Sequence, residues 1–495
     1  MRASQVQLVV AVVALLHTAA LMHGFPSSSR MTLKRAFPTN HRVELSQLRA
    51  RDALRHNSVI SFPVGGTFNP SLVGLYYAEI KLGSPPEKFH VQIDTGSDVL
   101  WVNCRPCIGC PIFTDLQTIE LNSYDPVSSN TSSLISCKDQ ICKDGVRLEE
   151  SLCSFQTNRC IYSFLYGDGS TTTGFYVSDL LSFETIGGRF DIDSRKTNSS
   201  ASIVFGCSNI ATGELSRADS ATDGIFGLGQ HKMSVISQLS SQGVAPKVFS
   251  HCLKGDDNGG GILVFGDIVE PNMVYTPLVP SQLHYNINLL NIYVNGQVVL
   301  PIDSREFTLS TSNGTIVDSG TTLAYLPKNV YDSFVKAVDE AASKNARLVP
   351  LQGFQCYSVD SSIINSTFPQ VSFNFSGGAS MVLKPKDYLL EQNSTDGTKL
   401  WCIGFLKNQN EDTTVLGDLV LKDKIVVYDL ANQRIGWTDY DCSMPVDVST
   451  NTSSETELVK VGAPISSTFQ KEPSKIMILI SIVTLLVYIA TLVDL

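Results

Sequence analysis

The feature that most constrains the fold is a short motif that occurs twice along the chain. Residues 93–97 read Ile-Asp-Thr-Gly-Ser, and residues 317–321 read Val-Asp-Ser-Gly-Thr. Each copy has an apolar residue, an aspartate, a hydroxyl residue, a glycine and a second hydroxyl residue. Each is followed by an apolar-apolar-Gly step, at 225–227 and at 415–417. A feature that recurs in the same order predicts a duplicated lobe.

Strand-like segments dominate the chain from residue 75 onward. Residues 75–82 precede a Gly-Ser-Pro-Pro turn, and residues 89–93 alternate apolar and polar side chains. Similar short runs are separated by turns rich in Gly, Asn and Asp, as at 256–259. The clearest helical spacing lies in 330–342, where apolar residues share one face. We therefore expect an all-β protein with few helices.

Two aspartates in matching surroundings, Asp94 and Asp318, indicate acid–base chemistry. A single Asp-Thr-Gly would more often be a turn, because these residues favour turns. Two carboxylates held about 3 Å apart cannot both ionise and therefore share a proton. One then acts as general base on a water while the other donates to a peptide carbonyl. This hypothesis requires no serine or cysteine nucleophile and no cofactor.

The residues beside the aspartates suit the same role. The hydroxyls of Ser97 and Thr321 are placed to hydrogen-bond the outer carboxylate oxygens. Those of Thr95 and Ser319 are placed to tie the two loops together. The intervening glycines let the backbone approach closely, because they carry no Cβ. They are Gly96 and Gly320.

The twelve cysteines are an even number and favour disulfides in an exported chain. Three of them are spaced C-x2-C-x2-C, which raises zinc as an alternative. No histidine lies nearby to complete a zinc site, so we expect no metal. The cysteines are Cys104, Cys107, Cys110, Cys137, Cys142, Cys153, Cys160, Cys207, Cys252, Cys356, Cys402 and Cys442.

Both ends of the chain predict passage through the secretory pathway. Residues 1–23 carry Arg2, an apolar run and then small residues, which is typical of a signal peptide. Residues 476–493 are almost entirely apolar and long enough to span a bilayer. Only Asp494 and Leu495 follow, without the basic residues that flank a membrane span on its cytoplasmic side. A glycolipid-anchor signal is therefore favoured over a single transmembrane helix, and we expect the extracellular face of the plasma membrane.

The segments that flank the body differ from it in composition. Residues 24–70 are basic and are interpreted as a propeptide covering an acidic cleft, with Lys34 or Arg35 as a partner of the aspartate pair. The alternative is a disordered basic arm. Residues 446–475 are rich in Ser, Thr, Glu and Pro and predict a flexible stalk before the anchor segment 476–495.

The charge and the glycosylation motifs also restrict the function. The formal net charge of -10 argues against a nucleic acid partner, because phosphate binding needs a basic surface. Asn-x-Ser/Thr motifs in an exported chain predict a glycosylated surface. They begin at Asn130, Asn198, Asn313, Asn365, Asn374, Asn393 and Asn451.

These motifs resemble the pepsin family of aspartic endopeptidases over residues 75–443. The resemblance implies two β-barrel-like lobes, at 71–275 and 276–445, that face each other across a cleft. It places the catalytic pair at Asp94 and Asp318 and the substrate beside the glycines of the two motifs and Thr321. It also implies polypeptide substrates, an acidic pH optimum and a monomer.

A further part of the resemblance concerns a β-hairpin flap over the cleft. Residues 162–170 end in Tyr-Gly-Asp-Gly-Ser, which makes Tyr166 the flap tyrosine and Trp101 its partner. The alternative for Tyr166 is an ordinary strand aromatic.

The closest subtype is the plant nepenthesin-like group. The chain shares Asp-Thr-Gly-Ser-Asp, Tyr-Gly-Asp-Gly-Ser and a cysteine-rich insertion at 104–160 with that group. A lipid-anchor tail is also familiar there. The resemblance suggests the disulfide pairs Cys356–Cys402 and Cys207–Cys442.

Three functions remain open from the sequence. An active endopeptidase is favoured, because Asp94, Asp318 and Tyr166 are all present. A catalytically silent binding protein of inhibitor or receptor type usually lacks one of these residues. A structural wall or adhesion protein leaves the duplicated motif unexplained.

Overall fold

The computed structural model describes most residues between 59 and 461, all within the compact unit Ala53–Leu495. The predicted signal peptide at 1–23, the predicted anchor segment 476–495 and the basic residues 24–58 lie outside the described residues. Within the described part of the chain, no helix is long and apolar enough to cross a bilayer. The described ranges are 59–67, 75–116, 119–147, 151–186, 196–219, 221–256, 259–301, 314–351, 353–393, 399–408, 413–452 and 455–461.

Strands dominate the described chain, as predicted, and the largest group forms a 15-stranded sheet. Its strands are β1 (Val59–Thr67), β2 (Leu75–Leu82), β3 (Glu87–Asp94), β4 (Leu100–Ile108), β5 (Ser133–Leu134), β6 (Leu152–Ser154), β7 (Arg159–Leu165), β8 (Thr171–Ile186), β9 (Lys196–Thr212), β10 (Gly224–Gly227), β11 (Val248–Leu253), β12 (Gly261–Phe265), β14 (Val274–Pro277), β28 (Lys424–Asp429) and β29 (Arg434–Asp439). Their order is β14-β29-β28-β11-β12-β1-β2-β3-β10-β4-β9-β8-β7-β6, with β5 beside β8.

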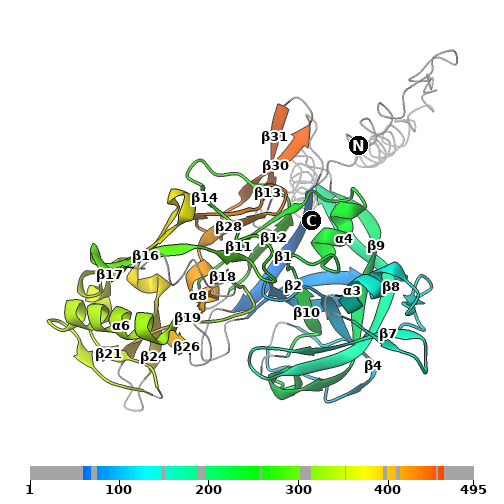
Figure 1. The fold of residues 1–495 in the computed structure, drawn as a ribbon, viewed down its shortest axis with the longest axis horizontal. Helices are drawn as coiled ribbons and strands as arrows, with labels where there is room; N and C mark the ends of the chain where they lie inside the picture. Colours follow the sequence, from blue (N-terminus) through cyan, green and yellow to red (C-terminus); the bar gives the residue numbers. More distant parts are fainter. Residues whose placement is uncertain are drawn as a thin grey trace, which may run out of the picture. The chain divides into compact units, whose positions relative to one another are not determined.

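The second half of the chain builds smaller sheets, so the two predicted lobes are present (Figure 1). One sheet has the order β15 (Asn286–Ile287), β18 (Thr315–Val317), β27 (Thr414–Leu416), β19 (Ala324–Pro327), β26 (Phe405–Asn408). A second has the order β17 (Gln297–Pro301), β16 (Leu289–Val294), β22 (Val371–Phe375), β23 (Ser380–Leu383). A third has the order β20 (Arg347–Leu348), β21 (Cys356–Ser358), β25 (Lys399–Ile403), β24 (Leu389–Asn393).

Helices are short, apart from the one that the sequence predicts. That helix is α6 (Lys328–Ala342), and it buries Val330, Phe334 and Val338 along one face. The others among the described residues are α3 (Gln140–Arg147), α4 (Val235–Ser241), α7 (Ile364–Thr367) and α8 (Asp418–Leu421), with 3-10 turns η2 (Gly213–Ser216), η3 (Ser361–Ile363), η4 (Ser376–Gly378) and η5 (Pro385–Asp387).

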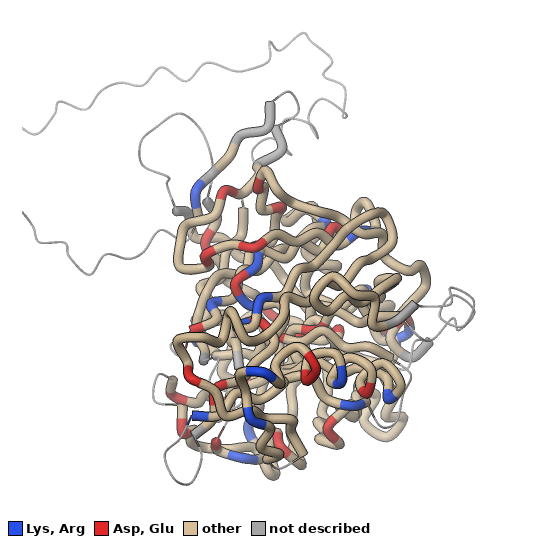
Figure 2. Tube along the Cα trace, turned by 90° about the vertical axis from the view of Figure 1, so that its left-hand side faces the viewer, with Lys and Arg blue, Asp and Glu red and all other residues tan. Residues whose placement is uncertain are grey.

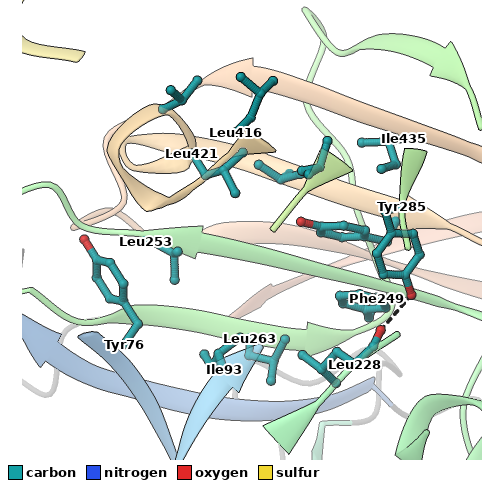
Figure 3. Packing of buried hydrophobic residues seen from close by; sticks show 14 of the residues in the cluster. Tyr76, Ile93, Leu228, Phe249, Leu253, Leu263, Tyr285, Leu416, Leu421 and Ile435 are labelled. Carbon is teal, nitrogen blue, oxygen red and sulfur yellow. Dashed lines mark hydrogen bonds between the residues drawn. The ribbon is translucent and has the colours of Figure 1, made fainter. Parts of the chain in front are cut away.

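A seam between the two halves runs through the large sheet. β28, from the end of the body, pairs antiparallel with β11, so that Phe249 lies opposite Tyr428. The buried apolar core is continuous across this seam and includes Ile93 from the first half and Leu416 from the second. Figure 3 shows these residues with Tyr285, whose hydroxyl donates to the carbonyl of Leu228 at 2.6 Å. The halves therefore share one core beneath the motifs.

All twelve cysteines lie within the described residues and form six disulfides. Cys356 is bonded to Cys402, as predicted, because the two are register partners on β21 and β25. The remaining pairs are Cys104–Cys207, Cys107–Cys110, Cys137–Cys153, Cys142–Cys160 and Cys252–Cys442.

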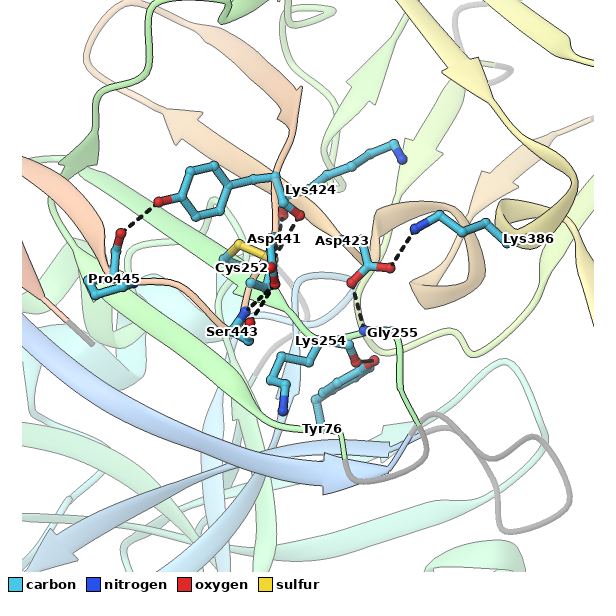
Figure 4. Close-up of a disulfide and its surroundings, with 12 residues drawn as sticks. Tyr76, Cys252, Lys254, Gly255, Lys386, Asp423, Lys424, Asp441, Ser443 and Pro445 are labelled. Carbon is cyan, nitrogen blue, oxygen red and sulfur yellow. Dashed lines mark hydrogen bonds and ion pairs between the residues drawn. A yellow bond between two sulfur atoms is a disulfide. The ribbon is translucent and has the colours of Figure 1, made fainter. Parts of the chain in front are cut away.

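The predicted Cys207–Cys442 pair is wrong. Cys207 lies on β9, which runs parallel to β4, and it bonds to Cys104 on that neighbour. Cys442 follows β29 and bonds to Cys252 on β11, two strands across the same sheet (Figure 4). The order of strands in the sheet decides these partners, and the cysteine spacing does not reveal it.

The two ends of the described body differ from their expected roles. β1, within the segment interpreted as propeptide, pairs with β2, β8 and β12 inside the large sheet. Residues expected to begin a flexible stalk form the hairpin of β30 (Val446–Thr452) and β31 (Glu455–Val461). β30 pairs with β13 (Asp267–Ile268), and Val446, Val448 and Val461 are buried. This valine alternation anchors the hairpin to the body.

Charged residues of both signs lie side by side over the described trace (Figure 2). One network follows β29, where Asp439 pairs with Lys384 at 3.3 Å and with Lys424 at 3.2 Å. Beside it Lys386 pairs with Asp423 at 3.1 Å, as Figure 4 shows. These pairs join η5 to the strands of the seam.

The glycosylation motifs fall in different surroundings. Asn130, Asn198 and Asn365 are exposed. Asn374 is half-buried, and its Oδ1 accepts hydrogen bonds from Ser372 and Ser380. Asn313 and the side chains of Asn393 and Asn451 lie outside the described residues. Glycosylation at these positions stays a prediction.

Candidate active site

The two motif aspartates lie at the ends of strands that are paired in the same way. Asp94 is the last residue of β3, which runs parallel to β10, with Asp94 level with Gly227. Asp318 directly follows β18, which runs parallel to β27, with Val317 level with Leu416. The downstream apolar-apolar-Gly steps are therefore the parallel partners of the aspartate strands. β10 and β27 are in turn flanked by the antiparallel strands β4 and β19.

Crossed hydrogen bonds tie the two motif loops together, as predicted for Thr95 and Ser319. Thr95 Oγ1 donates to the carbonyl of Val317 at 3.2 Å and accepts from the N–H of Ser319 at 2.9 Å. Ser319 Oγ donates to the carbonyl of Ile93 at 3.3 Å and accepts from the N–H of Thr95 at 3.2 Å. Both side chains are buried. The four bonds hold the two lobes in one relative position at the aspartates.

Each carboxylate accepts the same two hydrogen bonds from its own loop. One comes from the N–H of the motif glycine, and the other comes from the hydroxyl of the last motif residue, as predicted. The donors are Gly96 N (2.8 Å) and Ser97 Oγ for Asp94, and Gly320 N (2.8 Å) and Thr321 Oγ1 (2.6 Å) for Asp318.

The motif glycines bring the two carboxylates together. A Cβ on Gly96 would lie 2.6 Å from Oδ1 of Asp318, and a Cβ on Gly320 would collide with the carboxylate of Asp94. Each glycine thus packs against the aspartate of the other loop. A side chain at either position would push the carboxylates apart.

Electrostatics favour a shared proton. Asp94 is only 6 % exposed, and burial raises the pKa of its carboxyl to about 7, with a further contribution from the charge of Asp318. The hydrogen bonds from Ser97 and Gly96 act in the opposite direction. A carboxyl that keeps its proton beside an ionised partner is what general acid–base catalysis at acidic pH requires.

A third buried carboxyl, which the sequence reasoning missed, lies near the pair. Asp418 opens α8 directly after the second apolar-apolar-Gly step and is 1 % exposed. Burial raises its pKa well above the usual range, and the charges of Asp318 and Asp94 raise it further. The first step is followed by Leu228 instead, so comparison of the two motif copies would have singled out Asp418.

The predicted flap is a β-hairpin of β7 and β8, and Tyr166 lies at its turn. The Tyr166 hydroxyl accepts a hydrogen bond from Trp101 Nε1 at 2.7 Å, so the predicted pair is in contact. Gly169 adopts a φ of +84°, which favours glycine, and the N–H of Tyr166 donates to the carbonyl of Ser170.

Two residues of the Tyr-Gly-Asp-Gly-Ser motif to which the sequence assigned no role of their own, together with Glu214, secure the base of this turn. Ser170 is 1 % exposed, and its hydroxyl donates to Asp168 at 2.7 Å. The same oxygen accepts from the N–H of Glu214 in η2 at 3.1 Å. The flap turn is thus joined to the loop that follows β9. Among the described residues no cluster of His, Cys, Asp and Glu has the arrangement of a metal site.

Comparison with protein families matches both lobes. Residues 76–267 match a family described as "Xylanase inhibitor N-terminal", and residues 284–439 match "Xylanase inhibitor C-terminal". Aspartic proteinase 36 of Arabidopsis thaliana is 40% identical over 411 residues, which cover 82% of this chain and 82% of that protein. Aspartic proteinase nepenthesin-2 of Nepenthes gracilis is 29% identical over 387 residues, covering 74% and 78%.

Solved structures share the fold at lower identity. Basic 7S globulin from soybean superposes with a TM-score of 0.59 at 21% identity, covering 77% of this chain and 97% of that one. The structure titled "edgp" superposes with a TM-score of 0.63 at 19% identity, covering 78% and 96%. Likeness at this level of identity concerns the fold alone.

Proposed function

The chain belongs to the pepsin-like aspartic proteinase family of plants, and we propose that it is an active endopeptidase that uses Asp94 and Asp318. The observation that carries the proposal is the intact pair: two carboxylates on crossed, hydrogen-bonded loops, each packed against the glycine of the other.

In the proposed reaction, the two carboxylates hold one proton and a water between them. The ionised carboxylate takes a proton from the water, whose oxygen attacks the carbonyl carbon of the scissile peptide. The protonated carboxyl donates to the carbonyl oxygen, which gives a neutral gem-diol. The carboxyl that took the water proton then donates it to the leaving nitrogen, while the other carboxylate takes a proton from a gem-diol hydroxyl. The C–N bond breaks to give a carboxylic acid and an amine, and the pair again holds one proton.

The surrounding residues support these steps. Ser97 and Thr321 donate to the carboxylate oxygens, which keeps the acidic groups oriented without neutralising them. Tyr166 and Trp101 place the flap turn, which in the proposal covers an extended polypeptide substrate. As pH rises both carboxyls ionise, and the acid that donates to the substrate is lost. The activity should therefore be confined to acidic pH.

The test uses a protein that comprises residues 24–461 of this chain. After acidification, its cleavage of a denatured substrate protein is measured with and without pepstatin. The matched variants D94N and D318N replace a carboxyl by an amide of the same shape. Acid-dependent cleavage that pepstatin and both variants abolish is the expected result. A folded, processed protein that cleaves nothing would overturn the proposal.

A silent binding protein is the second candidate, because the matched family models carry the name of xylanase inhibitors. In that case the protein would bind a partner polypeptide in the cleft without turnover. Partner capture that survives D94N and D318N unchanged, together with absence of cleavage, would favour this alternative.

We also propose secretion and attachment to the outer face of the plasma membrane by a glycolipid anchor. The support is the sequence of the two ends together with the disulfides of the body. Release from intact cells by a phosphatidylinositol-specific phospholipase is expected. Retention after that treatment, with release by detergent alone, would indicate a transmembrane helix instead.

A further inference from the structure

The turn of the flap is closed by hydrogen bonds within residues 166–170. The N–H of Tyr166 donates to the carbonyl of Ser170 at 2.9 Å, and the N–H of Gly169 donates to the carbonyl of Tyr166 at 3.0 Å. The Asp168 carboxylate accepts from the N–H of Ser170 at 2.8 Å and from its hydroxyl at 2.7 Å. The turn therefore has a defined shape of its own, and its position depends on what holds it from outside.

Ser170 joins this turn to η2. A serine hydroxyl has one hydrogen, which Ser170 gives to Asp168, and the same oxygen accepts from the N–H of Glu214 at 3.1 Å. Gly213, the first residue of η2, has a φ of +66°, and a Cβ there would lie 2.9 Å from the Cα of Ser170. Ser170 is therefore seated directly against the start of η2.

The cysteine-rich insertion packs against the chain on both sides of η2. β4, β9, β8 and β7 are consecutive neighbours in the large sheet (Figure 1). In the turn closed by Cys107–Cys110, Gly109 has a φ of +78°, and a Cβ there would collide with the carbonyl oxygen of Ala211, just before η2. After η2, the carbonyl of Ala218 accepts from the N–H of Asp115 at 2.9 Å. The insertion therefore supports the loop on which Ser170 rests.

We propose that Ser170 is a positioning residue for the flap, and that the cysteine-rich insertion sets, through η2, where the flap lies over the substrate. The inference rests on the proposed endopeptidase function and gives the insertion a role in it. Trp101 holds Tyr166 at one end of the turn, and η2 holds Ser170 at the other. Without the Ser170 hydroxyl, the turn loses its bond to η2 and can shift about the Trp101 contact, so that it closes less well on a bound polypeptide.

The first test compares S170A with S250A. Ser250 on β11 is also buried, and its hydroxyl donates to the carbonyl of Gly266 at 2.8 Å and accepts from the N–H of Ile268 at 3.2 Å. Each variant removes one donated and one accepted hydrogen bond, so both should lose Tm to a similar extent.

The kinetic readout uses a peptide that contains a bond cleaved in the denatured protein. We expect S170A to lower kcat/KM about 2–10-fold, mainly through KM, and to weaken pepstatin binding by a similar factor. The pH dependence of kcat should stay as in wild type, because the change does not touch the carboxylate pair. S250A should leave kcat, KM and pepstatin binding unchanged.

Three glycine variants test the support beneath Ser170. G213A places a Cβ against Ser170, and G109A places one against the backbone of Ala211. Gly243 has a φ of +71°, but a Cβ there meets nothing within 4 Å, so G243A controls for the backbone strain alone. We expect G213A and G109A to lower kcat/KM and pepstatin affinity as S170A does, and G243A to lower only Tm.

The outcomes separate the two proposals. Unchanged kcat/KM and pepstatin affinity in S170A, in an active wild-type background, overturn the positioning role, as does an equal loss in S250A. A shifted pH profile of kcat in S170A also overturns it, because the change would then act on the carboxylates. Loss in S170A and G213A but not in a folded G109A overturns the part assigned to the insertion. A folded wild-type protein without acid-dependent cleavage overturns the endopeptidase function, and the positioning role with it.

Discussion

The two halves of the site share a backbone pattern but differ in what surrounds it. Asp94 and Asp318 end parallel strand pairs of the same kind and accept the same pair of hydrogen bonds. Beyond the motif the halves diverge. The first apolar-apolar-Gly step leads into Leu228, whereas the second leads into the buried carboxyl of Asp418.

The duplicated motif therefore sets the positions of the two carboxyls, whereas residues outside the repeat make the surroundings of the two carboxyls different. A dyad that shares one proton needs two carboxyls that are close but not identical in environment. The motif provides the closeness. The unrepeated Asp418 of α8 makes the surroundings of the two carboxyls different.

The largest effect should come from removing either member of the pair. D94N and D318N each remove a proton donor or acceptor, and general acid–base catalysis contributes about 10²–10⁴-fold. We expect losses in kcat of at least that size from both variants, with thermal stability retained, measured as cleavage of a denatured protein at acidic pH. If only one variant lost activity, the chemistry would rest on a single carboxyl.

The equivalence of the two glycines can be tested next. G96A and G320A place a Cβ against the opposite carboxylate, and overpacking of this kind costs about 1–3 kcal/mol. We expect both to lower the free energy of unfolding by that amount and to impair cleavage. G167A is the matched control for stability, because a Cβ there meets nothing within 4 Å. Equal stabilities for all three variants would contradict the close packing of the loops.

The pH dependence of stability should reveal Asp418. Its folded pKa is raised, so below the unfolded value near 3.8 the group is protonated in both states. Above that value the unfolded chain releases a proton that the folded protein retains, and stability falls as pH rises. We expect the drop in Tm between pH 4 and pH 8 to be smaller in D418N than in wild type. The difference should be about 2–4 °C for each kcal/mol of unfolding free energy that ionisation of Asp418 removes. An unchanged drop would mean that Asp418 ionises normally.

The smallest effect should come from the flap of the first half. W101F removes the donor to the Tyr166 hydroxyl, and one such bond contributes about 0.5–1.5 kcal/mol. We expect kcat/KM to fall about 2–10-fold. Combination with Y166F provides the control, since the two changes should not add if they act through the same bond.

Much of the site could be predicted because its chemistry is local in sequence. Ser97 and Thr321 each lie three residues after an aspartate, so their hydrogen bonds to it follow from the loop itself. The bonds of Thr95 and Ser319 cross between the loops, and the repetition of the motif predicted them. Asp418 was within reach of the same reasoning, through the mismatch with Leu228. The hairpin at 446–461 was missed because its Ser- and Thr-rich composition concealed an alternation of valines.

The mostly-β fold, the two lobes and the paired aspartates can be predicted from the sequence alone, because strand alternation and a repeated motif are local signals. Which strands are neighbours follows only from the folded structure. That order bonds Cys207 to Cys104 rather than to Cys442 and places His251 beside Tyr428. Such contacts join residues 103 to 190 positions apart, and one-dimensional spacing carries no information about which distant strands the core brings together.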